Sequence, residues 1–246
     1  MCGGIVAHIG GSGGRQEKHV RLAKEHLDIG IFTNQLEPQL RFWQEEVGLP
    51  FEEVLPTGPG NRQHRHGLNG SVFKLNASRD AVPLAPLAGY RELLIAREGL
   101  ARPRPLVDPD GNPVTLVPAG FEGVSGLGVR VAVRSMDVSR AYYRDALGWA
   151  EESPGRFRCG DSLLALFEDP AQDEAGNFRA CPGYRYMTVQ VWDTDAEFAR
   201  ATANGGREGM APVTLGATAR IAFVRDPDGN WLEISQRADL TGPLPG

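Results

Sequence analysis

The chain has 246 residues and a formal net charge of −5 at pH 7, with 26 Lys and Arg against 31 Asp and Glu. This length allows one or two domains of roughly 100 to 150 residues, each large enough to bury a core. The acidic balance leaves no basic stripe, which argues against a nucleic-acid partner. The sequence has no apolar run of the roughly 20 residues that a membrane-spanning helix needs, so no membrane partner is expected.

The first segment, residues 1–24, is expected to form a flexible arm. It contains Gly10-Gly-Ser-Gly-Gly14, which is typical of a linker, and it lacks the basic flank and apolar core of a signal peptide. A cytoplasmic location is therefore predicted. The opening Met1-Cys-Gly-Gly is similar to the start of an N-terminal-cysteine amidotransferase. Such a nucleophile needs a whole domain around it, so we expect no catalytic role for this cysteine.

Cysteine usage indicates neither a disulfide framework nor a thiolate metal site. The number of cysteines is odd and none forms a Cys-x-x-Cys pair. They are Cys2, Cys159 and Cys181.

One five-residue turn motif occurs twice. Asp108-Pro-Asp-Gly-Asn112 recurs as Asp226-Pro-Asp-Gly-Asn230, at an offset of 226 − 108 = 118 residues. Gly89-Tyr-Arg91 likewise recurs as Gly183-Tyr-Arg185, at an offset of 94. A repeat at this distance indicates tandem domains rather than a solenoid. We divide the chain into an arm (1–24), an N-terminal domain (25–119), a linker (120–126), a C-terminal domain (127–237) and a tail (238–246).

The predicted elements follow one order in both repeats. Each begins with a strand and continues with a helix whose apolar stripe ends at a glycine, followed by short strands separated by Gly, Asn and Asp turns. In the first repeat these are the strand 27–33, the helix 36–47 and the strands 51–55, 63–67 and 72–75. In the second they are the strand 129–133, the helix 136–147 and the strands 156–159 and 163–167. The unit is therefore β-α-β-β-β.

A further unit of the same kind closes the second repeat. It comprises the strand 186–191, the helix 195–203 and the strands 213–215, 220–224 and 231–235. Its counterpart in the first repeat runs from residue 90 to 96 and then passes directly to the turn. Because this interval is shorter by 118 − 94 = 24 residues, about the length of a helix with its connections, we predict that the first domain lacks one helix.

Three segments resemble the vicinal oxygen chelate superfamily, which includes glyoxalase I, bleomycin-resistance proteins and extradiol dioxygenases. They are Phe223-Val-Arg-Asp-Pro-Asp-Gly-Asn-Trp-Leu-Glu-Ile-Ser235, Ala141-Tyr-Tyr-Arg-Asp-Ala-Leu-Gly148 and Arg41-Phe-Trp-Gln-Glu-Glu-Val-Gly48. The resemblance implies an α+β fold of tandem glyoxalase-like domains. In each, paired β-α-β-β-β units would form a half-open barrel.

The resemblance also implies where a divalent metal would bind, but neither domain carries a His-His-Glu set. Only Glu233 in the last strand matches the family's acidic ligand, so Glu233 is the candidate catalytic residue and the candidate ligand for Fe, Mn, Zn or Ni. One carboxylate alone holds such an ion weakly. The alternative is a hydrogen-bonded carboxylate in a metal-free pocket. The matching positions are Gly128, Tyr186 and Glu233 in the C-terminal domain and Asp28, Glu92 and Thr115 in the N-terminal domain.

His64 and His66 form the other conspicuous feature. Residues two apart on a strand point to the same face, so the two imidazoles could bind a substrate or, with Asp28 or Glu92, a metal. Their polar surroundings favour the alternative that both histidines lie on a solvated hairpin tip.

Three more residues are candidate substrate ligands. Tyr186 and Glu92 occupy equivalent positions implied to line a barrel, although each could be an ordinary strand residue. Arg158 could meet an anionic ligand, although such arginines are more often surface charges. The two Asp-Pro-Asp-Gly-Asn turns are expected to be structural.

Two functions follow as hypotheses. The first is a divalent-metal-dependent enzyme of dioxygenase or lyase type acting on an oxygenated small molecule. The alternative is a metal-free small-molecule binding or sequestering protein of the bleomycin-resistance type. A metal-free enzyme that uses Glu233 or a histidine as acid or base is a weaker third hypothesis. No nucleotide cofactor is expected, and a homodimer stays open.

Overall fold

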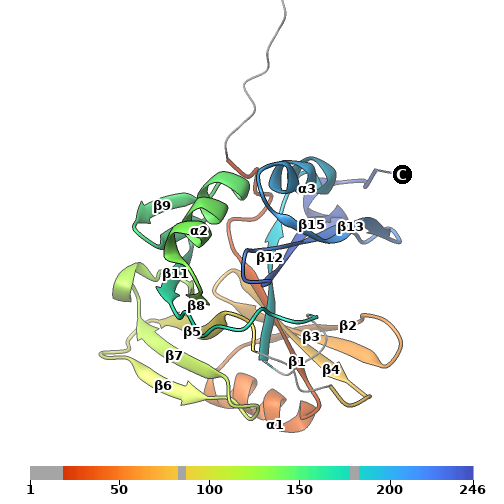
Figure 1. The fold of residues 1–246 in the computed structure, drawn as a ribbon. Helices are drawn as coiled ribbons and strands as arrows, with labels where there is room; N and C mark the ends of the chain where they lie inside the picture. Colours follow the sequence, from red (N-terminus) through yellow and green to blue (C-terminus); the bar gives the residue numbers. More distant parts are fainter. Residues whose placement is uncertain (1–18, 83–86, 178–182, 246) are drawn as a thin grey trace, which may run out of the picture.

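The computed structural model describes residues 19–82, 87–177 and 183–245 (Figure 1). Cys2, Cys181 and most of the predicted arm lie outside these ranges. Residues 19–24, which the sequence places in the arm, lie against a strand: the Ala23 N–H donates to the Gln190 carbonyl at 2.8 Å.

Each predicted unit is present as a run of strands, and three of the four contain a helix after their first strand. The first unit comprises β1 (Asp28–Thr33), α1 (Leu36–Arg41), η1 (Phe42–Glu46), β2 (Phe51–Pro56), β3 (Asn61–Leu68) and β4 (Ser71–Ser78). The second comprises β5 (Tyr90–Arg97), β6 (Arg104–Val107) and β7 (Pro113–Pro118), followed by η2 (Phe121–Gly123). The third comprises β8 (Leu127–Val133), α2 (Met136–Ala141), η3 (Tyr142–Ala146), β9 (Ala150–Ser153), β10 (Arg156–Cys159) and β11 (Ser162–Glu168). The fourth comprises β12 (Gly183–Gln190), α3 (Thr194–Ala203), β13 (Arg207–Leu215), β14 (Ala219–Arg225) and β15 (Trp231–Arg237), before α4 (Ala238–Thr241).

The first and third units repeat each other in detail. In both, the α-helix widens into a π-helical turn, in which the Val47 N–H donates to the Phe42 carbonyl and the Leu147 N–H to the Tyr142 carbonyl. Gly48 and Gly148 then adopt positive φ angles of 78° and 66°. This left-handed backbone ends the helix, and glycine adopts it without steric cost.

The units pair across the sequence repeats rather than within them. The first and fourth units form an eight-stranded sheet in the order β13-β14-β15-β12-β1-β4-β3-β2. The second and third form a seven-stranded sheet in the order β6-β7-β5-β8-β11-β10-β9. Tandem glyoxalase-like units in an α+β fold are therefore confirmed. The boundaries at residues 119 and 127 stay a proposal, because each sheet combines units from both sides of them.

The second unit has lost more than the predicted helix. Among the described residues β5 leads directly to β6, without counterparts of α3 or of β13. The positions of the strands in the sheets identify β13 as the strand without a counterpart, since β6-β7-β5 corresponds to β14-β15-β12. The 24 missing residues thus account for a helix and an edge strand.

The two faces of the seven-stranded sheet are both packed. One contributes to the main apolar core, which it shares with the eight-stranded sheet and the helices. On the other, Val124 from the linker packs with Leu94 and Leu163. A side chain at Gly128 would lie 2.8 Å from the Val124 Cγ2 atom. The linker therefore fills this face.

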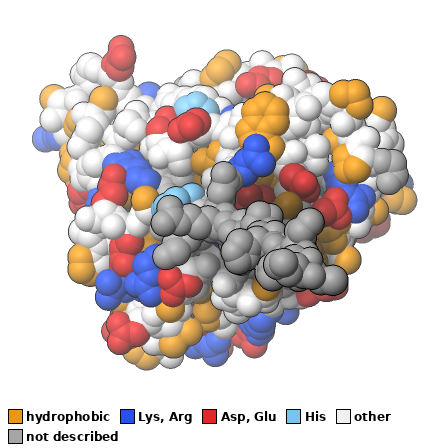
Figure 2. Space-filling model, turned by 90° about the horizontal axis from the view of Figure 1, so that it is seen from above, with side chains coloured by type: hydrophobic (Ala, Val, Ile, Leu, Met, Phe, Trp, Pro, Cys, Tyr) orange, Lys and Arg blue, Asp and Glu red, His pale blue; other side chains and the backbone are white. Residues whose placement is uncertain are grey.

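The surface shows no accumulation of one charge on the face drawn in Figure 2, where Lys and Arg alternate with Asp and Glu. Across the described residues, no helix has the length and apolar character needed to span a bilayer.

The two repeated turns are anchored by their first aspartate. Asp226 Oδ1 accepts from the backbone N–H groups of Asp228 and Asn230 at 2.9 and 2.8 Å, and Oδ2 accepts from Asn230 Nδ2 and the Tyr143 hydroxyl at 2.8 and 2.9 Å. Asp108 is held in the same way within its own turn. This geometry agrees with the structural role predicted for the turns.

We predict that the Tyr143 hydroxyl contributes to stability and that the neighbouring Tyr142 hydroxyl does not. Tyr143→Phe removes a hydrogen bond to a buried carboxyl and should lower the free energy of unfolding by about 1.5 kcal/mol. Tyr142→Phe is the matched control, because the Tyr142 hydroxyl is buried without a hydrogen-bond partner among the described residues. Urea denaturation measures both; equal losses would contradict the prediction.

We also predict that Asp226 titrates near neutral pH. Burial raises its pKa to about 6 from 3.8, although hydrogen bonds from Asn230 and Tyr143 oppose the rise. The folded state then binds this proton more tightly than the unfolded chain, so the group's contribution to stability is full below pH 3.8 and is lost as the pH rises through about 6. NMR titration of the Asp226 carboxyl carbon should show this midpoint; a midpoint near 4 would refute it.

Candidate functional site

A cavity of about 430 Å3 lies against the eight-stranded sheet, between the tip of the β2–β3 hairpin and strands β13 and β14. A second cavity of about 310 Å3 adjoins it. The residues that line both cavities are Pro56, Thr57, Gln63, Leu215, Ile221 and Glu233. Because the first and fourth units supply opposite walls, the cleft depends on their pairing.

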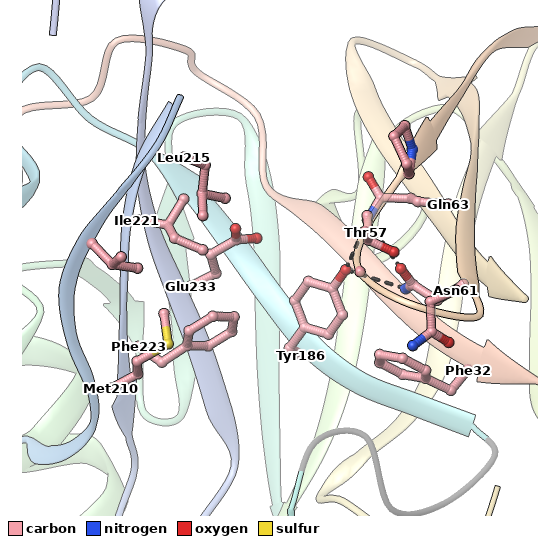
Figure 3. A pocket seen from close by; sticks show the side chains of 14 residues that line it. Phe32, Thr57, Asn61, Gln63, Tyr186, Met210, Leu215, Ile221, Phe223 and Glu233 are labelled. Carbon is pink, nitrogen blue, oxygen red and sulfur yellow. Dashed lines mark hydrogen bonds between the residues drawn. The ribbon is translucent and has the colours of Figure 1, made fainter. Parts of the chain in front are cut away.

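The larger of these two adjoining cavities, the main cavity, has one apolar wall and one polar wall (Figure 3). Met210, Leu215, Ile221 and Phe223 come from β13 and β14 and form the apolar wall. The facing wall carries hydroxyl and amide groups. They belong to Thr57, Asn61, Gln63, Asn76 and Tyr186.

Tyr186 lies on β12 with its hydroxyl in a polar cluster. The oxygen accepts hydrogen bonds from Gln63 Nε2 at 3.3 Å and Asn76 Nδ2 at 3.2 Å. Gln63 Nε2 also donates to Asn76 Oδ1 at 3.0 Å, which fixes both amides. Burial raises the pKa of Tyr186, and the charge of Glu233 raises it further. Tyr186 is therefore a neutral, positioned hydroxyl.

Gly30 on β1 makes room for this tyrosine. A Cβ atom at Gly30 would lie 2.2 Å from the Tyr186 ring, a separation that no side chain tolerates. The ring can lie across β1 only because residue 30 is glycine.

Glu233 joins an ion pair at the junction of the two cavities. Its Oε2 accepts from Lys74 Nζ at 2.8 Å and from the Thr188 hydroxyl at 2.6 Å. Lys74 Nζ also donates to Thr188 Oγ1 at 2.6 Å. The side chains of Lys74 and Glu233 are only 5% and 12% exposed. Both hydrogen bonds reach Oε2, and within the described residues Oε1 has no such bond.

Asp28 is the second carboxylate of this region, on β1 beside β12. It is fully buried and accepts from Lys24 Nζ, the Val72 N–H and Gln190 Nε2 at 2.7, 2.8 and 3.1 Å. Burial alone would raise the pKa of Asp28. The charges of Lys74 and Lys24, with the hydrogen bonds from Lys24 and Val72, hold it below its ordinary value.

The second cavity is the more polar of the two. Lys74 and Glu233 line it together with Arg65 and Arg237. Arg65 donates to Gln63 Oε1 at 3.1 Å, and Arg237 pairs with Asp239. Gln190 lines the same cavity, and its buried Oε1 lacks a hydrogen-bond partner among the described residues. This end of the cleft therefore suits an oxygen-rich group.

Of the six residues that the sequence nominated, only Glu233 and Tyr186 line the main cavity. Glu92 lies on β5 of the other sheet, where it accepts from the Thr115 hydroxyl at 2.6 Å and from Arg130 at 3.1 Å. Arg158 lies on β10 of that sheet and pairs with Glu152. The equivalent positions Glu92 and Tyr186 thus lie in different sheets, because Glu92 belongs to the second unit and Tyr186 to the fourth.

His64 and His66 share one face of β3, and it is the face turned to α1 and η1 rather than to the cleft. His66 is fully buried, and its Nε2 lies 3.0 Å from Gln44 Nε2. Burial lowers the pKa of His66 to about 4. His64 instead lines a separate hollow beside Leu36. The two-histidine set with Asp28 or Glu92 is not assembled, because Asp28 lies on the opposite face of the sheet and Glu92 lies in the other sheet.

Several polar residues in and beside the cleft were not nominated from sequence, among them Lys74, Thr188, Gln63 and Asn76. The sequence pattern could have indicated Lys74 and Asn76, because these polar residues alternate with Phe73 and Leu75 in an otherwise apolar strand. Such alternation places Lys74 and Asn76 on the face opposite the core. Thr188 follows the same logic in β12, between Met187 and Val189.

The donor set in this cleft does not fit the divalent metal that the family resemblance implies. A tight site of this type needs about three protein ligands. Glu233 instead shares Oε2 with an ammonium and a hydroxyl, and a nearby cation opposes a second positive ion. Among residues 19–82, 87–177 and 183–245, no three His, Cys, Asp or Glu side chains are grouped to hold a metal ion.

We predict that the Lys74–Glu233 pair is energetically coupled. Lys74→Met leaves the Glu233 carboxylate without its neighbouring cation and should lower the free energy of unfolding by about 3 kcal/mol. Adding Glu233→Gln should recover part of this loss, since the remaining side chain is neutral. Urea denaturation of the wild type, both single variants and the double variant measures the coupling. Strictly additive effects would contradict the pair as described.

Comparison with known proteins extends the fold assignment. Residues 127–234 match the sequence model of the Glyoxalase/Bleomycin resistance protein/Dioxygenase superfamily. Glyoxalase I from Zea mays has a similar fold, with a TM-score of 0.70 and 17% identity over 89% of this chain and 93% of its own. The cppA protein from Streptococcus pneumoniae TIGR4 has a TM-score of 0.56 and 10% identity over 88% of this chain and 99% of its own.

No curated protein matches the chain, and at these identities the likeness to solved structures concerns the fold alone. The chain has a tandem glyoxalase-like fold, and its residues 127–234 are similar in sequence to the Glyoxalase/Bleomycin resistance protein/Dioxygenase superfamily.

Proposed function

We propose that this protein binds a small molecule with an apolar body and an oxygen-bearing end in the cleft of the eight-stranded sheet, without a metal ion. The observation that carries the proposal is the cavity of about 430 Å3 between an apolar wall and the Tyr186–Gln63–Asn76 cluster. Small-molecule sites are typically mostly apolar, with a few positioned polar groups that orient the ligand.

The ion pair at the inner end supports the metal-free alternative over a dioxygenase or lyase. A metal-dependent reaction would require Glu233 as a ligand, and the Glu233 Oε2 atom is bound by Lys74 and Thr188. A ligand oxygen placed at this end would instead meet the ammonium, the hydroxyl or the Tyr186 phenol. The proposal is therefore a binding or sequestering protein of the bleomycin-resistance type.

One observation favours a second candidate, a metal-free acid–base enzyme. Glu233 Oε1 makes no hydrogen bond within the described part of the chain, and the carboxylate lines both cavities. A carboxylate held through one oxygen can take a proton with the other. Such an enzyme would exchange a ligand C–H proton with deuterium in D2O, and Glu233→Gln would abolish the exchange while keeping the shape of the side chain.

Blocking the cleft should prevent ligand binding. Val213 lines the main cavity and is 40% exposed, so Val213→Trp should fill the mouth with little effect on folding. We expect 8-anilinonaphthalene-1-sulfonate, an aromatic anion, to bind the wild type and to bind Val213→Trp at least about tenfold more weakly, a difference of roughly 1.4 kcal/mol. Fluorescence titration measures both affinities, and displacement of the dye then screens candidate ligands.

The matched control is Val107→Trp. Val107 is an exposed valine on the edge strand β6 of the other sheet, with 62% exposure. It should leave dye binding unchanged. If both tryptophan variants bind the dye as tightly as the wild type, the cleft is not the binding site.

A further inference from the structure

The ammonium of Lys74 lies in a row of polar groups that crosses four adjacent strands. The strands follow the order β15-β12-β1-β4, and they contribute Glu233, Thr188, Asp28 and Lys74. Thr188 is directly paired with Glu233 on one side and with Asp28 on the other. Neighbouring strands lie about 4.8 Å apart, so the four groups meet at the centre of the sheet.

Three groups close to Lys74 Nζ are of the kind that attracts a cation. Two are direct oxygen contacts, Thr188 Oγ1 at 2.6 Å and Glu233 Oε2 at 2.8 Å. The Tyr186 ring presents its face at 5.4 Å from the nitrogen. The charge of Lys74 also acts on the buried Asp28 carboxylate and helps to keep it ionised.

We infer that Lys74 is a built-in cation that occupies the place of a divalent metal ion in this cleft. The Glu233 carboxylate and the Thr188 hydroxyl contact it, and the buried Asp28 carboxylate interacts with it through its charge. These oxygen donors are the ligands that hard divalent ions such as Mn²⁺ and Mg²⁺ prefer. A lysine in the chain supplies the positive charge permanently. A ligand oxygen that enters the second cavity therefore meets an ammonium that the protein cannot lose.

The inference predicts that one substitution converts the cleft into a metal site. Lys74→Glu removes the ammonium and adds a third carboxylate, which completes the donor number that such ions require. Lys74→Met is the matched control, because it removes the charge and adds no ligand. The double variant Lys74→Glu/Glu233→Gln removes one carboxylate again and should reverse the gain.

The test uses MnCl2 alone, titrated into each metal-stripped protein and followed by calorimetry and by the electron paramagnetic resonance of free Mn²⁺. We expect the wild type and Lys74→Met to lack a stoichiometric site. Lys74→Glu should bind one Mn²⁺ at least about tenfold more tightly than Lys74→Met, and Mn²⁺ should raise its melting temperature. Stoichiometric binding by the wild type that is lost in Glu233→Gln would overturn the inference.

A folded Lys74→Glu protein that binds Mn²⁺ no better than Lys74→Met would overturn it as well. If Lys74→Glu does not fold without metal, the denatured variant is refolded with and without MnCl2. Recovery of folded protein only with Mn²⁺ supports the inference. If neither refolds, Lys74→His titrated with NiCl2 decides in the same way, a gain supporting the inference and no gain overturning it. These titrations contain no organic ligand, so their failure leaves the proposed small-molecule site standing.

Discussion

The antiparallel pairing of β1 with β12 is the constraint on which the site depends. It joins the first unit of the chain to the last, with Asp28 opposite Thr188 and Gly30 opposite Tyr186. The eight-stranded sheet is continuous only through this pairing, here called the β1–β12 seam, since β4 pairs with β1 and β15 pairs with β12. Contacts so distant in sequence carry a large entropic cost before they form, so the cleft should form late in folding, with the whole chain in place.

Within this sheet, Lys74 and Glu233 decide which chemistry the cleft can support. A buried carboxylate is costly unless a partner compensates its charge, and here the partner comes from the opposite end of the chain. The seven-stranded sheet differs from the eight-stranded sheet at the corresponding place. Its corresponding face is packed by Val124 from the linker, and its second unit lacks the helix and the edge strand of the fourth. The two adjoining cavities both lie against the eight-stranded sheet.

The sequence predicted what local pattern can encode. The repeated turns, the helix-ending glycines and the alternation around Glu233 led to the fold and to the two nominated residues that line the cleft, Glu233 and Tyr186. The pairing of units could not be predicted in this way, because strands of similar pattern fit either partner. Lys74 was missed for that reason: its alternation marks it as facing away from the core, but only the β1–β12 seam reveals the carboxylate that it meets. Glu92 was nominated through repeat alignment, and the same seam places it in the other sheet.

The most direct test of the central claim is a crystal structure of the wild-type protein grown with millimolar MnCl2 and measured at the manganese absorption edge. We expect Lys74 Nζ within hydrogen-bonding distance of Glu233 and Thr188, and no anomalous peak between Glu233 and Asp28. An anomalous peak bound to Glu233, with Lys74 turned away from it, would contradict the account and restore the metal-dependent hypothesis.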